Sequence, residues 1–528
     1  MADTSSNLNQ PSKCHEGEAN QNETAQENQP SDYETAISAT KFGKFNILLV
    51  VITLISTLSV ESETAVMAYI IPMAVCDLNL TSNQKGLLNS MAFLGMVLSG
   101  FFWGFLVDTV GRRKMLIMGF VAETLVTVGK SLTTRVGLLY FYQFCGGALV
   151  GGLYVATNTY LHELHSTSRR GYVQMMYGAT FCVANVLIPV MCALTILFNV
   201  YFKNIFMGYF SWNILLLVSA IPSLLSAISL LLLPETPKFL MSTGNNKEAL
   251  RVFQQIHKMN RKDPTEKYKI TNLIDEVVDD EEEEIVHKSW KEYFQSGWNH
   301  IMPLFSKEHR INLLLVSIVH SILQFVLNTL RLYLPQVFQA AHDYEVANNK
   351  TSSICDALAW LRYSGTDEEQ IICSLDLINN FDVYLNSMIV STVLLIAYIS
   401  AGAVINTFGK KNLFTVLNIA GSASVACLYF SPNTSTTVIL SSSFFICIGI
   451  CFDLLIIIIM VLFPTTLRAM AYSITLLLGR LLTIAGNLII PWLVSFGCAS
   501  LFVTFGSLTF GSLLLSFLIP DTDKMDMK

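Results

Sequence analysis

The chain has 528 residues, of which 52% are hydrophobic and only 14% are charged, and its mean hydropathy is +0.50. A soluble globular protein carries about 25% charged residues, so this composition excludes that class. It predicts an integral membrane protein built from α-helices. The formal net charge is −6, and an acidic run at 275–284 supplies much of the acid, while no basic tract suggests a nucleic-acid partner.

Residues 1–44 are polar and rich in Asn, Gln, Glu and Ser, and they predict a disordered cytosolic tail. This tail has no short apolar stretch after an N-terminal base, so we expect no cleaved signal peptide. Six apolar runs long enough to cross a bilayer follow it. They lie at about 46–71, 87–107, 114–130, 137–160, 172–198 and 208–233.

A polar segment, 234–310, separates these runs from six more, and a short cytosolic tail, 520–528, ends the chain. Within this central loop, Leu250, Phe253 and Ile256 share one helical face and predict a short helix over 245–259. The last six runs lie at about 311–338, 384–406, 412–430, 437–463, 470–495 and 499–519. The sequence therefore predicts twelve transmembrane helices in two bundles, 45–233 and 311–519.

Basic residues predict the orientation, because Lys and Arg concentrate in cytosolic loops. Runs of two or three basic residues, such as Arg112 to Lys114 and Arg169 to Arg170, all fall on one side, which also holds both termini and the central loop. The loops of the other side carry single bases, including Lys85 and Lys130.

Three sequons also fall on this second, lumenal side, as glycosylation requires. Asn349 is the preferred acceptor because its loop, 339–383, is long; Asn79 is a second candidate, and Asn433 lies close to the membrane. Cys355 and Cys373 lie in the same loop and could pair there in an oxidising compartment.

One loop motif occurs twice, at a constant separation of 298 residues, such as that from Gly104 to Gly402. The motif "GFLVDTVGRRKML" (104–116) holds Gly104, Asp108, Gly111, Arg112 and Arg113, and its weaker copy holds Gly402, Asn406, Gly409, Lys410 and Lys411. The same separation relates Arg170 to Arg468 and Glu163 to Val461. Two homologous halves of six spans, with a site at their interface, are a transporter architecture.

The residue types of this motif suit a tight turn between helices, since glycine permits positive φ and an acid at a helix end can face a neighbouring helix terminus. The alternative is that the basic residues of the motif only determine the orientation of the chain in the membrane. We favour a cytosolic gate at this motif, with Arg170 and its match Arg468 in the second repeated loop. The motif residues are Gly104, Asp108, Gly111, Arg112 and Arg113.

These motifs resemble those of the major facilitator superfamily. The run 104–114, with "YLHELHSTSRRG" (160–171) and "LLPETPKFL" (232–240), is similar to motifs of its sugar-porter and organic-ion branch. Longer stretches, at 32–46, 83–114, 234–260 and 463–488, resemble the synaptic vesicle glycoprotein 2 family.

The resemblance implies the twelve-helix fold of that superfamily. It also implies that Asp108 meets the eleventh span and closes the cytosolic side, with Arg112 pairing nearby and Glu163 bracing the gate through Arg169 or Arg170. The second half lacks both acids, at Asn406 and Val461, so its side of the gate should be weaker.

Charged residues inside the apolar runs are candidates for a substrate or proton site, because a charge at the bilayer centre costs about 2.5–3.5 kcal/mol. Glu63 could bind a cation or a proton, whereas Asp453 and Arg480 could equally form a structural ion pair. Tyr333 and Asn328 could line the same cavity, although ordinary helix packing also explains them. The candidates are Glu61, Glu63, Glu123, Asn328, Arg331, Tyr333, Asp453 and Arg480.

Together these features predict a secondary transporter that moves a small organic solute, with organic ions among the candidates, by rocker-switch alternating access. A proton or another ion could be coupled, and no nucleotide-binding, metal-binding or nucleophile–base motif indicates a cofactor, a metal or an enzyme. The alternative is a non-transporting scaffold or trafficking protein on a transporter fold. Either would be a multi-pass protein of the plasma membrane or an intracellular vesicle membrane.

Overall fold

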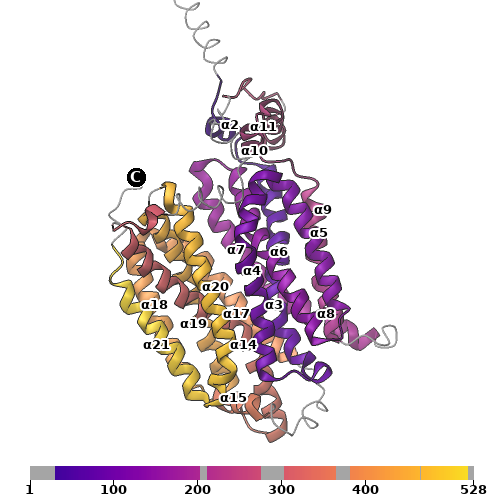
Figure 1. Ribbon diagram of the computed structural model, residues 1–528, viewed down its shortest axis with the longest axis vertical. Helices are drawn as coiled ribbons and strands as arrows, with labels where there is room; N and C mark the ends of the chain where they lie inside the picture. The colour runs from indigo at the N-terminus through magenta and orange to yellow at the C-terminus, as the bar shows by residue number, and fades with distance from the viewer. Residues whose placement is uncertain are drawn as a thin grey trace, which may run out of the picture.

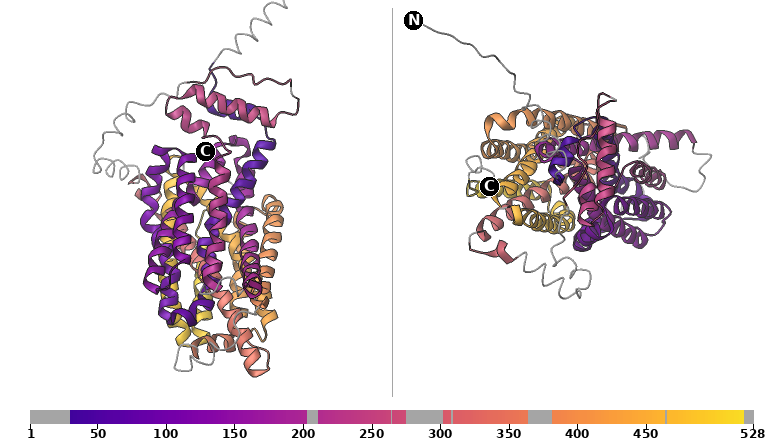
Figure 2. Two further views of the ribbon diagram at one scale, coloured as in Figure 1. Left: turned by 90° about the vertical axis from the view of Figure 1, so that its right-hand side faces the viewer. Right: turned by 90° about the horizontal axis from the view of Figure 1, so that it is seen from above.

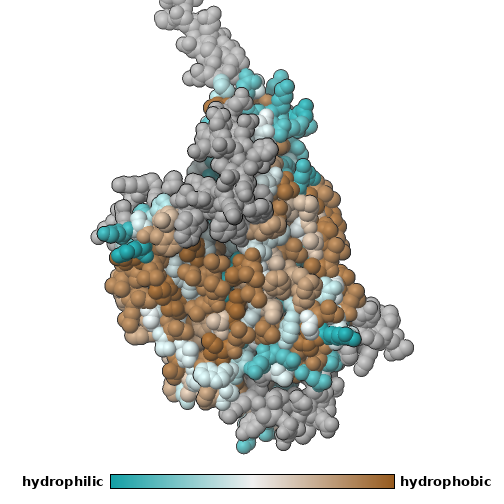
Figure 3. All heavy atoms as spheres, viewed as in Figure 1, coloured by the Kyte–Doolittle hydropathy of each residue, from teal (hydrophilic) through white to brown (hydrophobic). Residues whose placement is uncertain are grey.

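The computed structural model describes residues 30–202, 211–263, 265–274, 302–307, 309–363, 381–463 and 465–520. Long helices stand side by side in an upright bundle, and a layer of short helices covers one end (Figures 1 and 2). In this part of the chain, nine helices are long and apolar enough to cross a membrane. Apolar residues form a broad band around the face of the bundle shown in Figure 3, as expected of a surface that meets lipid.

The first half of the chain forms one bundle, in which α4 and α6 pack along their length. A break at Ala220, two residues before Pro222, divides its last span into α8 and α9. The helices of this bundle are α3 (Lys44–Leu78), α4 (Ser82–Val110), α5 (Arg112–Ser131), α6 (Val136–Glu163), α7 (Thr167–Phe202), α8 (Ser211–Ser219) and α9 (Ile221–Leu230).

The second half forms a matching bundle. Its helices are α14 (Arg310–Asn348), α17 (Phe381–Phe408), α18 (Lys410–Leu428), α19 (Thr434–Leu462), α20 (Thr465–Ser495) and α21 (Cys498–Ser516). The bundles meet where α4 packs on α20, α3 on α14 and α7 on α17. The predicted division into two sets of six membrane helices corresponds to this arrangement, with α8 and α9 counted as one span.

We call the end of the molecule that carries the turn at Gly111 the motif end, and the opposite end, with Asn79 and Asn349, the distal end. A layer of α2 (Tyr33–Ala39), α10 (Pro237–Ser242) and α11 (Asn246–Asn260) lies over the motif end (Figure 1). Its core contains Tyr33, Ile37 and Phe253.

This layer changes two expectations from the sequence. The helix predicted over 245–259 is α11, but residues 33–39, which we expected to be disordered, form α2 because the apolar side chains of Tyr33, Ala36 and Ile37 are buried against α11. The acidic run 275–284 and residues 1–29 lie outside the described residues.

The two loop motifs fold as the repeat predicts. Gly111 ends α4 and caps α5 with φ 96°, and Gly409 caps α18 with φ 76°. Positive φ at both positions explains why each copy has glycine there. A Cβ on Gly111 would also lie 2.8 Å from a ring carbon of Phe239.

Replacing Gly111 with Ala is therefore expected to cost about 1–3 kcal/mol from the backbone alone, and more from the contact with Phe239. Gly244, also at positive φ (73°), has nothing within 4 Å of where its Cβ would lie, so it provides the matched control. We expect the melting temperature of the purified protein to fall more for Gly111→Ala than for Gly244→Ala. Equal losses would show that the Phe239 contact is unimportant.

The structure of the distal end shows that the predicted disulfide partner of Cys355 is wrong. Cys355 bonds to Cys498, with their Cα atoms 5.3 Å apart, and not to Cys373, which lies outside the described residues. Cys355 is the second residue of α15 (Ile354–Tyr363), which contacts α20 and α21. This packing brings Cys355 to the start of α21, so the disulfide ties the long loop to the bundle.

Candidate functional site

An ion pair joins the two bundles halfway along their length. The guanidinium of Arg331 on α14 lies 2.9 Å from a carboxylate oxygen of Glu61 on α3, and the side chains are 30% and 13% exposed. Arg331 also donates to the Thr64 hydroxyl at 3.4 Å. Both residues lie near the middle of helices that cross the membrane, where charges are usually functional. The sequence predicted both residues but not that they pair.

Two tyrosines of the first bundle, Tyr154 and Tyr177, lie close enough to Glu61 to interact with it. Tyr154 of α6 packs on Tyr177 of α7, with ring centroids 6.1 Å apart. Across the interface, Tyr472 of α20 lies within hydrogen-bonding reach of Tyr154, and Arg480 is close enough to interact with both tyrosines. Hydroxyl groups and charges are the kinds of group that can bind a small polar solute.

Asp453 of α19 belongs to the same group, and its carboxyl lies within hydrogen-bonding reach of Tyr398 on α17. Asp453 and Arg480 are both among the described residues, and no ion pair joins them. The structural ion pair that the sequence analysis considered is therefore absent. Two acids, Glu61 and Asp453, and two bases, Arg331 and Arg480, thus face the space between the bundles. Their formal charges balance.

A second buried cluster lies inside the first bundle. The ammonium of Lys130 on α5 lies 2.5 Å from a carboxylate oxygen of Glu63 and donates to Gln143 on α6 at 2.9 Å. Glu123, about two helical turns before Lys130, accepts a hydrogen bond from Thr127 at 3.5 Å. All of these side chains are at most 4% exposed. The cluster holds two carboxyl groups but only one ammonium.

Lys130 therefore lies where the sequence did not place it. We expected it in a lumenal loop, but α5 continues to Ser131 and buries Lys130 against α3 and α6. Two further predicted residues, Asn328 and Tyr333, lie on α14; Asn328 is half-buried. Tyr333 donates to the Asn487 carbonyl at 3.4 Å and lines a separate cavity at the distal end.

At the motif end, Arg112 pairs with Glu163 at 3.2 Å and stacks over the ring of Phe239. The predicted pairing of Glu163 with Arg169 or Arg170 is not what the structure shows. Arg170 instead pairs with Glu34 of the α2 layer at 2.6 Å, and Arg169 lies over the Phe42 ring. Glu34 of α2 and Phe42, which lies between α2 and α3, thus supply the partners that we sought within the membrane bundle.

The same layer contacts Glu163 directly, because the Tyr33 hydroxyl donates to the Glu163 backbone carbonyl. Burial, the largest cause, raises the pKa of the Tyr33 phenol above its usual value, so the hydroxyl remains protonated and able to donate. This contact fixes α2 to the end of α6.

Glu235 is a functional candidate that sequence reasoning missed. Its carboxylate accepts a hydrogen bond from the Arg113 backbone N–H at 2.9 Å, and the Arg113 side chain donates to the carbonyls of Leu230 and Leu231. The signal was present in "LLPETPKFL" (232–240), which holds the only acid of that run. Glu235 and Arg113 tie the end of α9 to the turn at Gly111.

Other gate predictions remain untested by side-chain geometry. The side chains of Asp108 and of 402–408 lie outside the described residues, and of Gly104 the structure gives only its place on α4. Arg468 is half-buried in the first turn of α20. The closing role of Asp108 therefore stays a prediction.

Comparison with known proteins decides the family. The family model for sugar (and other) transporters matches residues 16–349, which is more than half of the chain. The chain belongs to this family. The membership places it among transport proteins rather than enzymes, and the chain is a multi-pass membrane protein.

Curated relatives support the resemblance seen in the motifs. Human synaptic vesicle glycoprotein 2B is 25% identical to this chain over 330 residues, which cover 59% of this chain and 48% of the relative. Synaptic vesicle glycoprotein 2A of Rattus norvegicus is 25% identical over 304 residues, or 54% of the chain and 41% of the relative. The matched segment thus spans about half the length of these relatives.

Solved structures confirm the fold of the major facilitator superfamily. The inward-open structure of the xylose transporter XylE from E. coli aligns with a TM-score of 0.63 at 15% identity, covering 91% of this chain and 98% of that one. A D-xylose–proton symporter aligns with a TM-score of 0.59 at 18% identity, covering 92% and 99%. At these identities the likeness concerns the fold.

Proposed function

We propose that this family member is a secondary transporter that moves a small polar organic solute by alternating access. The observation that carries the proposal is the Glu61–Arg331 pair, which joins the bundles at mid-depth at 2.9 Å. A solute that binds there contacts both halves at once. Since binding energy can be shared between the halves, their relative position can respond to the solute.

The charges of the site favour a particular class of solute. Glu61 and Asp453 are balanced by Arg331 and Arg480, so a solute with a large net charge would leave one charge unpaired. The tyrosine hydroxyls around them offer hydrogen bonds. A neutral hydroxylated solute, such as a sugar-like molecule, or a zwitterion therefore fits better than a simple organic cation or anion.

The test is uptake by proteoliposomes that contain the full-length protein, with a panel of labelled sugars, zwitterionic amino acids, organic cations and organic anions. We expect one of the first two classes to accumulate, and Glu61→Gln and Arg331→Gln each to lower its uptake at least tenfold, which is about 1.4 kcal/mol. The exposed pair of Glu248 and Arg251 on α11 gives the control, Glu248→Gln with Arg251→Gln. If no class is bound or taken up, the scaffold alternative replaces the proposal.

Proton coupling is proposed for the buried cluster. Glu63 and Glu123 share one base, Lys130, and a buried charge without a partner is costly, so a proton that enters this cluster would balance its charges. Because α3 carries both Glu61 and Glu63, a movement of α3 on solute binding would also move Glu63 relative to Lys130. We expect an inward proton gradient to accelerate uptake by the wild type but not by Glu123→Gln. Equal acceleration in both would place the coupled proton elsewhere.

The orientation is also proposed. Asn79 and Asn349 end α3 and α14 at the distal end, each exposed and with φ near 50°. We infer that this end is lumenal or extracellular and that the motif end is cytosolic. Glycosidase treatment should increase the gel mobility of the protein from eukaryotic cells, and the shift should shrink in Asn349→Gln. A glycosylated sequon engineered between α10 and α11 would reverse the assignment.

A further inference from the structure

A cavity lies at the distal end, away from the Glu61–Arg331 pair. Its volume is about 370 Å³, which falls in the range of about 300–1,000 Å³ typical of small-molecule sites. We call it the distal cavity. Its wall is formed by α4 from the first bundle, by α14, α18, α20 and α21 from the second, and by α15. It therefore crosses the junction between the bundles.

The wall of the distal cavity is mostly apolar. Leu334, Ile490, Phe502 and Phe505 are buried residues that line it. Trp492 also lines it but is 60% exposed, on a membrane-spanning helix near the distal end. Tryptophan at such a depth commonly marks the membrane interface, so the cavity reaches the surface that faces lipid.

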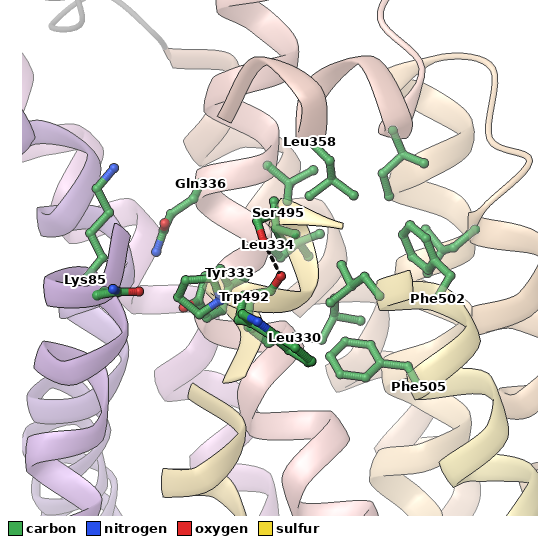
Figure 4. Close-up of a pocket in the computed structure, with 18 residues that line it drawn as sticks. Lys85, Leu330, Tyr333, Leu334, Gln336, Leu358, Trp492, Ser495, Phe502 and Phe505 are labelled. Carbon is green, nitrogen blue, oxygen red and sulfur yellow. Dashed lines mark hydrogen bonds between the residues drawn. The ribbon is translucent and has the colours of Figure 1, made fainter. Parts of the chain in front are cut away.

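One cation lies at the edge of this apolar space. Lys85 lines the cavity from the first turn of α4, and Figure 4 shows it on the opposite side from Phe502 and Phe505. No carboxylate among the described residues forms an ion pair with Lys85. Gln336 projects between Lys85 and the apolar wall and adds a hydrogen-bonding amide (Figure 4).

The geometry points to a binding site for an anionic amphiphile, with one acyl chain in the distal cavity and a carboxylate or phosphate group beside Lys85. A long apolar chain matches the wall, an anion matches the lysine, and the exposed Trp492 marks an entrance from the bilayer. A free fatty acid and an anionic phospholipid share this chemistry.

An acyl chain in the distal cavity would also affect how the two bundles pack against each other. At this level α4 and α20 are in close contact, since a Cβ on Gly86 would lie 2.4 Å from the Asn487 carbonyl and Ser90 donates to the Ile484 carbonyl at 3.3 Å. A chain that fills the space beside this contact touches both helices. It therefore stabilises the arrangement in which the distal ends are together.

The test measures the binding of photoreactive diazirine palmitate to the full-length protein in detergent, followed by peptide mapping. We expect labelling of α14, α20 or α21, competition by palmitate, and at least tenfold weaker competition in Lys85→Gln but not in Lys85→Arg. Val337→Trp, which fills the cavity, should abolish labelling there. Labelled peptides outside these helices, or equal competition in Lys85→Gln and the wild type, would overturn the proposal.

Further competitors separate the sources of the anion. Competition by phosphatidylglycerol at a lower concentration than palmitate identifies a phospholipid, and the reverse order identifies a free fatty acid; both results support the site. Hexadecanol and phosphatidylcholine, which have no net charge, should compete weakly. If they match palmitate, the lysine has no role and the proposal fails. The Lys85 variants keep the test valid if Val337→Trp does not fold.

Discussion

Replacing Lys130 with Met is expected to destabilise the protein by about 3–5 kcal/mol, because it leaves Glu63 and Glu123 buried without a cation. Lys130 is 1% exposed and contacts Glu63 at 2.5 Å, so water cannot replace it. Methionine has a similar length and keeps most of the packing. The measurement is the melting temperature and the fraction of monodisperse protein after purification in detergent.

The double variant Lys130→Met with Glu63→Gln provides the control. It removes one carboxylate together with the ammonium, so only Glu123 remains as a buried carboxyl group. We expect it to recover at least half of the lost stability, as coupling between contacting residues requires. If the double variant is no more stable than Lys130→Met, the loss comes from packing and not from unpaired charge.

The second large effect is expected at Gly147, where α6 touches α4. A Cβ on Gly147 would lie 2.0 Å from the Ala92 carbonyl oxygen, and one on Gly95 would lie 2.2 Å from the Phe144 carbonyl oxygen. The two backbones are thus in direct contact, as small residues allow between membrane helices. Gly147→Val is expected to cost about 3 kcal/mol or more, the upper end for overpacking, because both obstacles are backbone atoms.

Gly178 on α7 is the matched position, since nothing lies within 4 Å of where its Cβ would be. Gly178→Val should leave the melting temperature within a few degrees of the wild type, whereas Gly147→Val should yield mostly aggregated protein. A well-folded Gly147→Val variant of unchanged melting temperature would show that α4 and α6 do not pack this closely.

The membrane helices and the two halves could be predicted because each depends on a local pattern. About twenty apolar residues make a span whatever surrounds them, and the repeated motif fixes the turns at Gly111 and Gly409, where positive φ requires glycine. The family resemblance came from the same short stretches. These features need no knowledge of which helix lies beside which.

The partners of the charged residues could not be predicted because they depend on helix rotation. Residues two apart on a helix point about 200° apart, since each turn has about 3.6 residues. Glu61 accordingly faces Arg331 between the bundles, whereas Glu63 faces Lys130 inside one bundle. On α14, Arg331 and Tyr333 diverge in the same way, so the sequence could not assign them to separate sites.

Long-range contacts explain the remaining errors. Glu34 pairs with Arg170 only because α2 folds onto the motif end, and Cys355 reaches Cys498 only because α15 packs against α21. Each contact joins segments that are far apart in the sequence. Hydropathy also cannot separate a lysine in a loop from one buried in an ion pair, which is why Lys130 was misplaced.

The most direct test of the central claim is to lock the distal ends of the two bundles together. The Tyr69 and Tyr384 rings stack there at 5.7 Å, and the Tyr384 hydroxyl lies 3.8 Å from the Met73 sulfur. Met73→Cys with Tyr384→Cys can be joined by a short, reducible thiol cross-linker, and Thr124→Cys with Ser223→Cys, whose native hydroxyls lie 2.9 Å apart within the first bundle, gives the control.

The measurement is proteoliposome uptake of the solute that the panel identifies, before cross-linking, after it and after reduction. Alternating access predicts that the Met73–Tyr384 link stops uptake, that reduction restores it, and that the control link has no effect. Undiminished uptake by the linked protein would contradict the account, because the bundles would then not need to separate at the distal end.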